Sequence, residues 1–369
     1  MEKDKIKIPM LRPYNSAELE RAVIDVIRSG RHVGGPEIES FEEEFSTYIG
    51  VDYAVTANSA TSAEMLALVA LGVRPRSQIL VPSYTMYATV EQIFQVGATP
   101  VFVDIDETFN MDPVDLEAKI TDMCVGVLPV HFAGHSVDMR RINEIAECND
   151  LWVLEDCAQA HGAKQHDRRV GGFGIAGTFS FFPSKNLGTI GDGGIVTTND
   201  ACIANRVRML RNHGSSDRYT HEEAGFGLRF DAVKAAVCRL KLKLLDDFNN
   251  QRRANAEYYN QLLSDVDIVL PIERDDCFHV YHLYAILLPG GKEVRNGLKA
   301  YLHDAGIETN IHYPVACHQQ PATVNLIGRC GGLPKTEAVA NSILSLPMYP
   351  GLGKSEIEYV CDRIKTYLL

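Results

Sequence analysis

Short apolar runs alternate with helix-like stretches between residues 54 and 200. The runs are rich in Val, Ile, Leu and Phe and lack clean alternation with polar residues, which is typical of strands buried on both faces of a sheet. Helical patterns of apolar residues lie between them, for example at 63–71, 89–96 and 137–148. This rhythm predicts an α/β domain with a mainly parallel sheet. Its strands are expected at 53–56, 78–84, 99–106, 124–130, 151–156, 178–182 and 194–198.

The pattern changes after residue 230. A long helical stretch without Pro or Gly occupies 231–263. It is followed by strand-like segments at 279–288 and 308–313, a helix through residue 302, and two closing helices. We therefore expect a smaller α+β domain joined to the large one by the long helix, with the large domain at 1–245 and the small domain at 246–369.

The last helix is expected to begin with a capping box, in which Ser355 is the N-cap and Glu358 lies three residues later. The apolar residues that follow share one face at helical spacing. They are Ile357, Val360, Cys361 and Ile364.

Charge and composition narrow the classes of partner. The net charge of -12 argues against nucleic acid or an anionic membrane, although a local pocket can still bind a phosphorylated ligand. No apolar run approaches the length of a membrane span, and the N-terminus lacks the apolar core of a signal peptide. The nine cysteines form no CxxC pair, which suits free thiols in a reducing cytoplasm. We expect a cytoplasmic protein.

Two residues near strand ends carry the most informative chemistry. Asp156 closes an apolar strand in LWVLEDCAQAHGA, and Lys185 follows another strand in GTFSFFPSKNLGTIGDGG. Ligands of parallel sheets collect beyond the carboxyl ends of strands, so both side chains should face one crevice. A lysine held partly neutral there is nucleophilic towards an aldehyde. A carboxylate there can keep a pyridine nitrogen protonated. Taken singly, Asp156 could be a helix cap and Lys185 a solvated lysine; as a pair they predict a pyridoxal-phosphate (PLP) site.

The segment TANSATSAEMLALVALG supplies a candidate phosphate site. A strand runs into Ser59, Ala60 and Thr61 and then directly into a helix. Small hydroxyl residues at a helix start serve as N-caps. The same helix start presents N–H groups and the positive dipole end to an anion. Ser180, shortly before Lys185, is a further phosphate candidate.

Two other motifs have simpler explanations. Residues 172–177 fit the GxGxxG spacing, but a charged turn precedes them and a strand is expected after them, whereas a dinucleotide site needs a strand before and a helix after. His131 and His135 are four residues apart on a strand-to-loop stretch without a third ligand, so core or substrate contacts are favoured over a metal site. We expect no metal.

Several blocks in order resemble a known family over nearly the whole chain. They include SGRHVGGPEIESFEEEFSTYIGVDYAV, VPSYTMYATVEQI, GATPVFVDID, VHFAGH, EDCAQAHGA, SFFPSKNLGTIGDGGIVTTND, RMLRNHG, HVYHLY and IHYPVACHQQPA. The chain is similar to the DegT/DnrJ/StrS sugar aminotransferases, PLP enzymes of the aspartate-aminotransferase fold (fold type I). So many blocks over 300 residues are far more specific than any single motif.

The resemblance implies roles for individual residues. Lys185 is the Schiff-base lysine and the acid/base that moves the substrate proton, and Asp156 pairs with the pyridinium nitrogen. Gln159 lies near the ring hydroxyl, while Ala60, Thr61 and Ser180 hold the phosphate. The substrate contacts implied are Arg229, His312 and Tyr313. The resemblance also implies a homodimer with active sites at the subunit interface.

The chain departs from the family pattern at two positions. The family usually has an Asn two residues before Arg229, which reaches across the dimer to the phosphate, and this chain has Gly227. The aromatic residue that covers the cofactor ring in the family is Met86 here.

The function expected from the resemblance is transfer of an amino group to a keto group on a nucleotide-linked sugar, with glutamate as donor and C3 as the expected position. A keto-cyclitol or a free keto sugar is an alternative acceptor. The family's dehydratase branch has His in place of the lysine, so Lys185 argues against it. A catalytically silent regulator or binding protein of the same fold is a further alternative.

Overall fold

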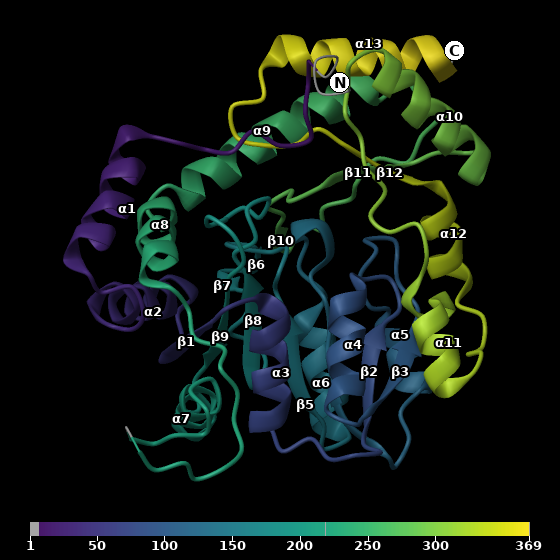
Figure 1. Cartoon of the computed structure of the whole chain (residues 1–369). Coiled ribbons are helices and arrows are strands. Elements are labelled where there is room, and N and C mark those ends of the chain that lie inside the picture. Colours follow the sequence, from purple (N-terminus) through teal and green to yellow (C-terminus); the bar gives the residue numbers. More distant parts are fainter. Residues whose placement is uncertain (1–6, 218, 369) are drawn as a thin grey trace.

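The computed structural model describes residues 7–217 and 219–368 and contains a seven-stranded central sheet (Figure 1). Its strands are β1 (Tyr53–Ala57), β2 (Gln78–Pro82), β3 (Thr99–Val103), β4 (Cys124–Val127), β5 (Trp152–Asp156), β8 (Ala176–Ser180) and β9 (Gly194–Thr198). The order is β1-β9-β8-β5-β4-β2-β3; β9 runs antiparallel to both of its neighbours, and all other neighbouring pairs are parallel. All seven predicted strands and the mainly parallel sheet are therefore confirmed. β2, β3 and β4 end two or three residues earlier than predicted, where the chain leaves the sheet.

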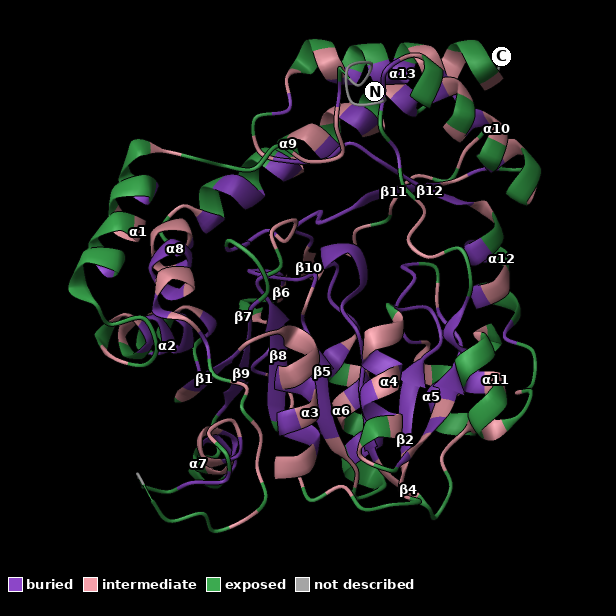
Figure 2. Ribbon diagram, in the orientation of Figure 1, coloured by how far each residue is buried: buried purple, intermediate pink, exposed green. Residues whose placement is uncertain are grey.

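Helices cover the sheet, whose strands are largely buried (Figure 2). The helices of this part are α1 (Ala17–Ser29), α2 (Pro36–Ile49), α3 (Ala60–Ala70), α4 (Tyr87–Gln95), α5 (Pro113–Ala118), α6 (Met139–Cys148) and α7 (Ala201–Leu210), with the 3-10 turn η1 (Phe132–Gly134). One core lies between α3, α4 and the sheet, where Leu66, Val90 and Val196 are fully buried. The burial of both sheet faces explains why the strands lack alternation in the sequence.

The helix predicted over 231–263 is two helices, so that prediction is wrong as a single element. α8 (Ala232–Leu242) ends just before α9 (Leu245–Leu263). Cys238 of α8 packs into a core shared with α2, whereas Tyr259 of α9 packs into the C-terminal core. Because the two apolar faces point to different cores, the chain changes direction at Lys243 and Leu244 without a Pro or Gly.

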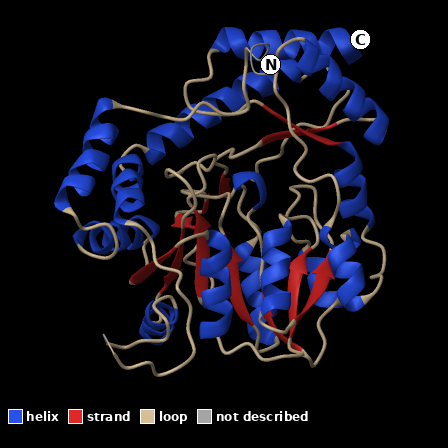
Figure 3. Ribbon diagram, in the orientation of Figure 1, coloured by secondary structure: helices blue, strands red, loops and turns tan. Residues whose placement is uncertain are grey.

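The C-terminal part is built on a two-stranded antiparallel sheet (Figure 3). Its elements are β11 (Tyr284–Leu287), β12 (Ile343–Leu346), α10 (Gly291–Asp304), η2 (Cys317–Gln319), α11 (Pro321–Ile327), α12 (Pro334–Ser342) and α13 (Lys354–Leu368). A further small sheet comprises β6 (Lys164–Gln165), β7 (Arg168–Arg169) and β10 (Cys277–Phe278). Its first two strands lie between β5 and β8 in the sequence.

Three expectations for this part are wrong. The segment 308–313 is irregular and makes one isolated bridge, from Asn310 to Ser345. The partner of β11 is instead β12, a buried four-residue strand that is too short to show a period. The strand-like pattern at 279–288 gives a strand only at β11, and three helices rather than two follow α10.

The predicted capping box is wrong, because α13 begins before Ser355. α13 begins at Lys354, and Gly353 N donates to Glu356 Oε2 at 2.9 Å. Glu358 accepts a hydrogen bond from the Tyr258 hydroxyl instead. The predicted apolar face of α13 is confirmed, because its buried residues are Ile357, Val360, Cys361 and Ile364.

The proposed domain division at residue 245 coincides with the first residue of α9. The N-terminal segment also reaches the C-terminal core, because Ile8 is buried there and bridges Ile307. No helix within the described ranges combines the length and apolar character needed to cross a membrane.

Candidate active site

A cavity of about 320 Å³ lies where β5 and β8 end, with residues of the C-terminal part on its other side. Of the eleven site residues predicted from the sequence, ten line it and one does not. The ten are Ser59, Ala60, Thr61, Met86, Asp156, Gln159, Ser180, Lys185, His312 and Tyr313. Asp156 and Lys185 therefore face one cavity, as expected from their positions after parallel strands, and His312 and Tyr313 line it as the family resemblance implies.

Asp156 is the last residue of β5 and is only 6% exposed. Its Oδ2 accepts from Thr89 Oγ1 at 2.8 Å, and its Oδ1 accepts from the backbone N–H of Ala158 at 2.9 Å. Both bonds come from neutral donors, so the negative charge is held in place without being neutralised. A carboxylate of this kind is suited to a cationic ligand group.

Lys185 lies in the loop after β8, and the surrounding protein lowers its pKa. Burial is the largest cause and lowers the pKa from 10.5 to about 8, although the charge of Asp156 raises it. At pH 7 about one amine in ten is then neutral, compared with fewer than about one in a thousand for an ordinary lysine. Lys185 is therefore a competent nucleophile at neutral pH.

The start of α3 forms an anion site at the edge of the cavity. Ser59 is the N-cap, and its Oγ accepts from Ser62 N at 3.1 Å. The N–H groups of Ala60 and Thr61 belong to the first turn, where a helix offers no acceptor of its own. The backbone of β9 packs tightly beneath, because a Cβ added at Gly194 would lie 2.3 Å from Ser59 O. This arrangement can bind a phosphate.

Gln159 and Tyr313 join the two parts of the protein across the cavity. Gln159 Oε1 accepts from Ala133 N at 2.7 Å, and its Nε2 donates to the Tyr313 hydroxyl at 3.2 Å. Tyr84 donates its hydroxyl to His312 O at 2.6 Å and accepts from Tyr313 N at 2.9 Å. These bonds fix the segment that carries both predicted substrate contacts.

The histidines that line the cavity are neutral at physiological pH. Burial lowers the pKa of His312 to about 4, and its Nδ1 lies 3.0 Å from Ser345 Oγ. Burial also lowers the pKa of His282 well below its usual value, and its Nδ1 lies 3.1 Å from Asn186 Oδ1. The positive charge of Lys185 adds to both shifts. Both rings can therefore offer hydrogen bonds without repelling a cationic lysine.

Arg229 is the predicted site residue that the cavity does not contain. It is exposed, donates to Asn212 Oδ1 at 3.3 Å, and lines a separate surface pocket with Arg208 and Arg211. Nearby Gly227 leaves room for a histidine, because a Cβ at this position would lie 2.9 Å from His213 Cε1. Packing against His213 thus accounts for the missing side chain at Gly227.

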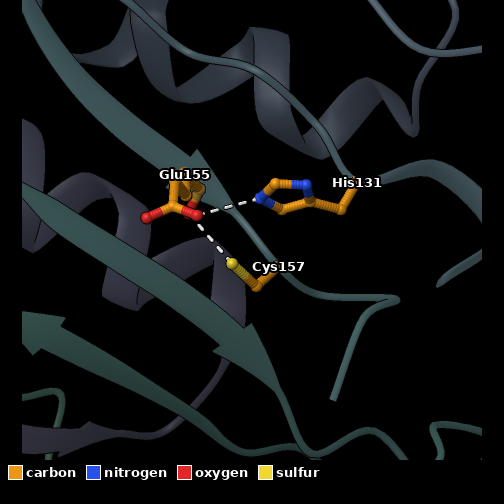
Figure 4. Close-up of side chains that lie close together, drawn as sticks. All are labelled: His131, Glu155 and Cys157. Carbon is orange, nitrogen blue, oxygen red and sulfur yellow. Dashed lines mark hydrogen bonds and ion pairs between the residues drawn. The ribbon is translucent and has the colours of Figure 1, made fainter. Parts of the chain in front are cut away.

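His131, Glu155 and Cys157 are buried and lie close together (Figure 4). Their ligand atoms lie within 4.8 Å of one another. However, Glu155 already accepts from three backbone N–H groups, those of Gly171, Phe173 and Gly174, and from His131 Nε2 at 3.1 Å.

The other two residues of this cluster are also occupied. His131 Nδ1 accepts from Val137 N at 3.1 Å, and burial raises the pKa of the Cys157 thiol. The cluster is therefore a hydrogen-bonded structural unit. Two of the N–H groups that donate to Glu155, those of Phe173 and Gly174, belong to the GxGxxG segment, whose last two residues begin β8 rather than a helix.

Three further residues of the cavity matter chemically and were not predicted from the sequence. Thr89 orients Asp156, His282 lies opposite Lys185, and Glu64 lies on the inward face of α3. Thr89 and His282 stand inside the quoted blocks PSYTMYAT and HVYHLY, so the resemblance could have found them. Glu64 had no such signal, because a single acid in an apolar helix normally marks its solvent face.

Comparison with known proteins identifies relatives over nearly the whole chain. Residues 13–365 match the DegT/DnrJ/EryC1/StrS aminotransferase family. The chain is 41% identical over 353 residues to dTDP-3-amino-3,4,6-trideoxy-alpha-D-glucose transaminase of Streptomyces venezuelae, covering 95% of this chain and 92% of the relative. It is 38% identical over 353 residues to UDP-N-acetyl-3-dehydro-alpha-D-glucosamine 3-aminotransferase of Acidithiobacillus ferrooxidans, covering 95% and 94%.

The fold is shared with solved structures. The X-ray structure of S. venezuelae DesV in complex with a ketimine intermediate superposes with a TM-score of 0.92 at 41% identity, covering 95% of this chain and 94% of that one. The family resemblance and the fold class predicted from the sequence are confirmed.

Proposed function

Because the chain belongs to the DegT/DnrJ/EryC1/StrS aminotransferase family, we propose that it converts the 3-keto group of a nucleotide-linked sugar to an amine. It is a sugar aminotransferase, and its cofactor is pyridoxal 5′-phosphate. The two relatives described above are named for amination at C3, one on a dTDP-linked and the other on a UDP-linked sugar. Their agreement supports C3 as the position, and their difference leaves the nucleotide open.

The residues of the cavity fit this cofactor. Lys185 offers an amine whose pKa is about 8, and Asp156 offers a buried carboxylate that hydrogen bonds fix without neutralising. The start of α3 offers first-turn N–H groups above the tightly packed Gly194. This pairing of Lys185 and Asp156 in one cavity is the observation that carries the proposal.

Each of these groups has a proposed task. When bound, pyridoxal phosphate supplies an aldehyde carbon that captures amines and a protonated ring that withdraws electrons from the reacting carbon. Lys185 would hold the aldehyde carbon, and Asp156 would keep the ring nitrogen protonated. Ser59, Ala60, Thr61 and Ser180 would hold the phosphate through the start of α3 and the end of β8.

Lys185 Nζ is also the proposed proton carrier of the reaction. Its low pKa lets the neutral amine accept a proton and the charged form return it near pH 7. Gln159 and Met86 would contact the ring, and His312 and Tyr313 would contact substrate from the C-terminal side of the cavity. Closure of the cavity by the segment that carries His312 and Tyr313 would exclude bulk water.

We propose glutamate as the amino donor and a homodimer as the active assembly. Large apolar side chains near the cavity support an assembly, since Met86 is 53% exposed and Phe182 and Ile190 are each 48% exposed. Arg229 is exposed and lies outside its own cavity, which suits a residue that contacts the site of a neighbouring subunit. The nine free cysteines support a reducing compartment such as the cytoplasm.

A substrate panel tests the acceptor. Purified enzyme with glutamate is offered dTDP- and UDP-linked sugars with a keto group at C3 or C4, a free 3-keto sugar and a keto-cyclitol, and products are identified by mass spectrometry. We expect amination of a nucleotide-linked 3-keto sugar. Amination of only the free sugar or the cyclitol would select the alternative acceptors, and amination of only the 4-keto sugars would overturn the C3 assignment.

A second experiment tests the attachment of the cofactor. Borohydride reduction of the yellow holoenzyme should leave a pyridoxyl group on the peptide that contains Lys185. The Lys185→Ala variant should bind the cofactor without this attachment and lose turnover. Transaminase activity near that of the wild type in this variant would refute the role of Lys185.

A further inference from the structure

Five carboxylates are buried among the described residues, and four of them have clear partners. Glu42 forms an ion pair with Arg211, and Glu155 accepts hydrogen bonds from three backbone N–H groups. Asp104 accepts a hydrogen bond from Thr336, and Asp156 accepts one from Thr89. The fifth, Glu64, is 4% exposed, and its Oε1 is buried with no hydrogen-bond partner within the described ranges. A buried polar atom without a partner costs free energy, so this one requires an explanation.

Glu64 lines the cofactor cavity. It lies on α3, one helical turn after Ala60 and Thr61, and all three residues line the same cavity as Asp156 and Lys185. The unpartnered carboxyl is therefore available to a ligand in that cavity and to no other described group.

The charges that face Glu64 are both negative. They are Asp156 at the end of β5 and Glu91 on α4. Burial and these two charges raise the pKa of Glu64 well above 4.5. Its surroundings therefore favour the protonated form of the side chain, which has one O–H to donate.

We propose that Glu64 is a positioning residue of the cofactor site. As a neutral acid it donates a hydrogen bond into the cavity, and it keeps the wall beside Asp156 at a single negative charge. Loss of its proton would place a second anion one turn from the helix start at which the phosphate is proposed to bind. This inference rests on the proposed cofactor site and adds to it a carboxyl that holds the ligand only while protonated.

The test compares Glu64→Gln, which keeps a neutral hydrogen-bond donor, with Glu64→Leu, which has none. Pyridoxamine 5′-phosphate is the ligand, because it cannot bond covalently to Lys185, and its Kd is measured by fluorescence from about pH 5 to about pH 9. Glu91→Gln tests the cause of the shift, because it removes a charge that raises the pKa of Glu64. It removes a neighbouring acid that is half-buried and does not line the cavity.

Above the pKa of Glu64, the Kd of the wild type should rise relative to that of Glu64→Gln by up to about tenfold per pH unit. Glu64→Leu should bind at least about fivefold more weakly than Glu64→Gln at every pH, because it lacks the donor. In Glu91→Gln the pKa of Glu64 should be lower, so the Kd should begin to rise at a lower pH than in the wild type. Equal pH dependence in wild type and Glu64→Gln, or equal affinity of the Gln and Leu variants, would overturn the proposal.

The protein without cofactor gives an independent measurement. In the unfolded chain Glu64 ionises near 4.5, whereas in the folded chain it stays protonated to higher pH. The folded state then binds more protons, so the folding equilibrium constant of the wild type relative to Glu64→Gln should fall by up to about tenfold per pH unit above about 4.5. A ratio that does not change with pH would refute the neutral acid. Failure of the wild type to bind the ligand would instead refute the proposed cofactor site.

Discussion

Asp156→Asn separates the charge of this residue from its place in the fold. In the wild type the Asp156 carboxylate lies 2.9 Å from Ala158 N and 2.8 Å from Thr89 Oγ1. Asn retains a carbonyl oxygen that can accept from Ala158 N, and its amide can donate to Thr89 Oγ1. Because a hydroxyl can accept as well as donate, neither neighbour loses its partner. The free energy of unfolding should therefore change by less than about 1 kcal/mol.

The effect on the rate should be much larger. A neutral amide cannot keep the ring nitrogen protonated, and removal of an electrostatic partner at a reacting centre typically costs about 2.7–4 kcal/mol, on the order of 10²–10³ in rate. A change in Lys185 cannot produce this loss. Asp156 raises the pKa of Lys185, so its removal leaves that pKa below about 8 and the amine more fully neutral.

The assay is the single-turnover release of 2-oxoglutarate from glutamate by the cofactor-loaded enzyme. Thr89→Val is the matched control, because it removes one hydrogen bond to Asp156 and keeps the charge. The control should lose only about 1 kcal/mol, or roughly fivefold in rate. A loss of less than about threefold in Asp156→Asn would show that the charge has no part in catalysis.

Three further predictions concern Lys185, Met86 and Arg229. Burial lowers the pKa of Lys185 from 10.5 to about 8, so the stability of the cofactor-free wild type relative to Lys185→Met should rise with pH between these values. At pH 7 the Lys185→Met variant should be the more stable protein. Urea unfolding measures both stabilities, and a difference independent of pH would contradict the shift. Met86→Tyr should bind the cofactor within a few-fold of wild type, because sulfur–aromatic and aromatic contacts contribute similar energies of about 0.3–1.5 kcal/mol. Met86→Ala should bind it clearly more weakly. Unchanged affinity in the Ala variant would exclude contact with the ring. Equal amounts of Lys185→Ala and Arg229→Ala subunits are refolded together. If Arg229 serves the partner's site, about one quarter of wild-type activity should return, because half of the randomly formed dimers then contain one intact site. No recovery would place Arg229 in its own subunit's site.

The central sheet could be predicted because its signal is local. Each of the seven strands is an apolar run bounded by turns, and Asp156 ends β5 as predicted, whereas β8 ends at Ser180, two residues before its predicted end. The parallel arrangement places Asp156 and Lys185 at one cavity, whereas a residue as distant as Tyr313 is assigned to it only through the family resemblance.

The errors arose where tertiary contacts override the local pattern. The break between α8 and α9 is caused by two cores that face different directions, which a continuous helical pattern does not reveal. The strand β12 is only four residues long and acquires its identity from pairing with β11. Glu64 escaped notice because its significance depends on Asp156 and Glu91, which reach it from other elements.

The hydrogen bonds around Glu155 have a consequence for the adjacent residue. Successive side chains of a strand point to opposite faces, so Glu155 and Asp156 are committed to opposite sides of β5. A slip of β5 by one residue would exchange the two carboxylates, placing the longer one in the cavity and the shorter one among the amides of Gly171, Phe173 and Gly174. Those three N–H groups match only the longer side chain at its present position. They therefore set the alignment of β5 against β8 and, with it, the depth at which the Asp156 carboxylate stands in the active site.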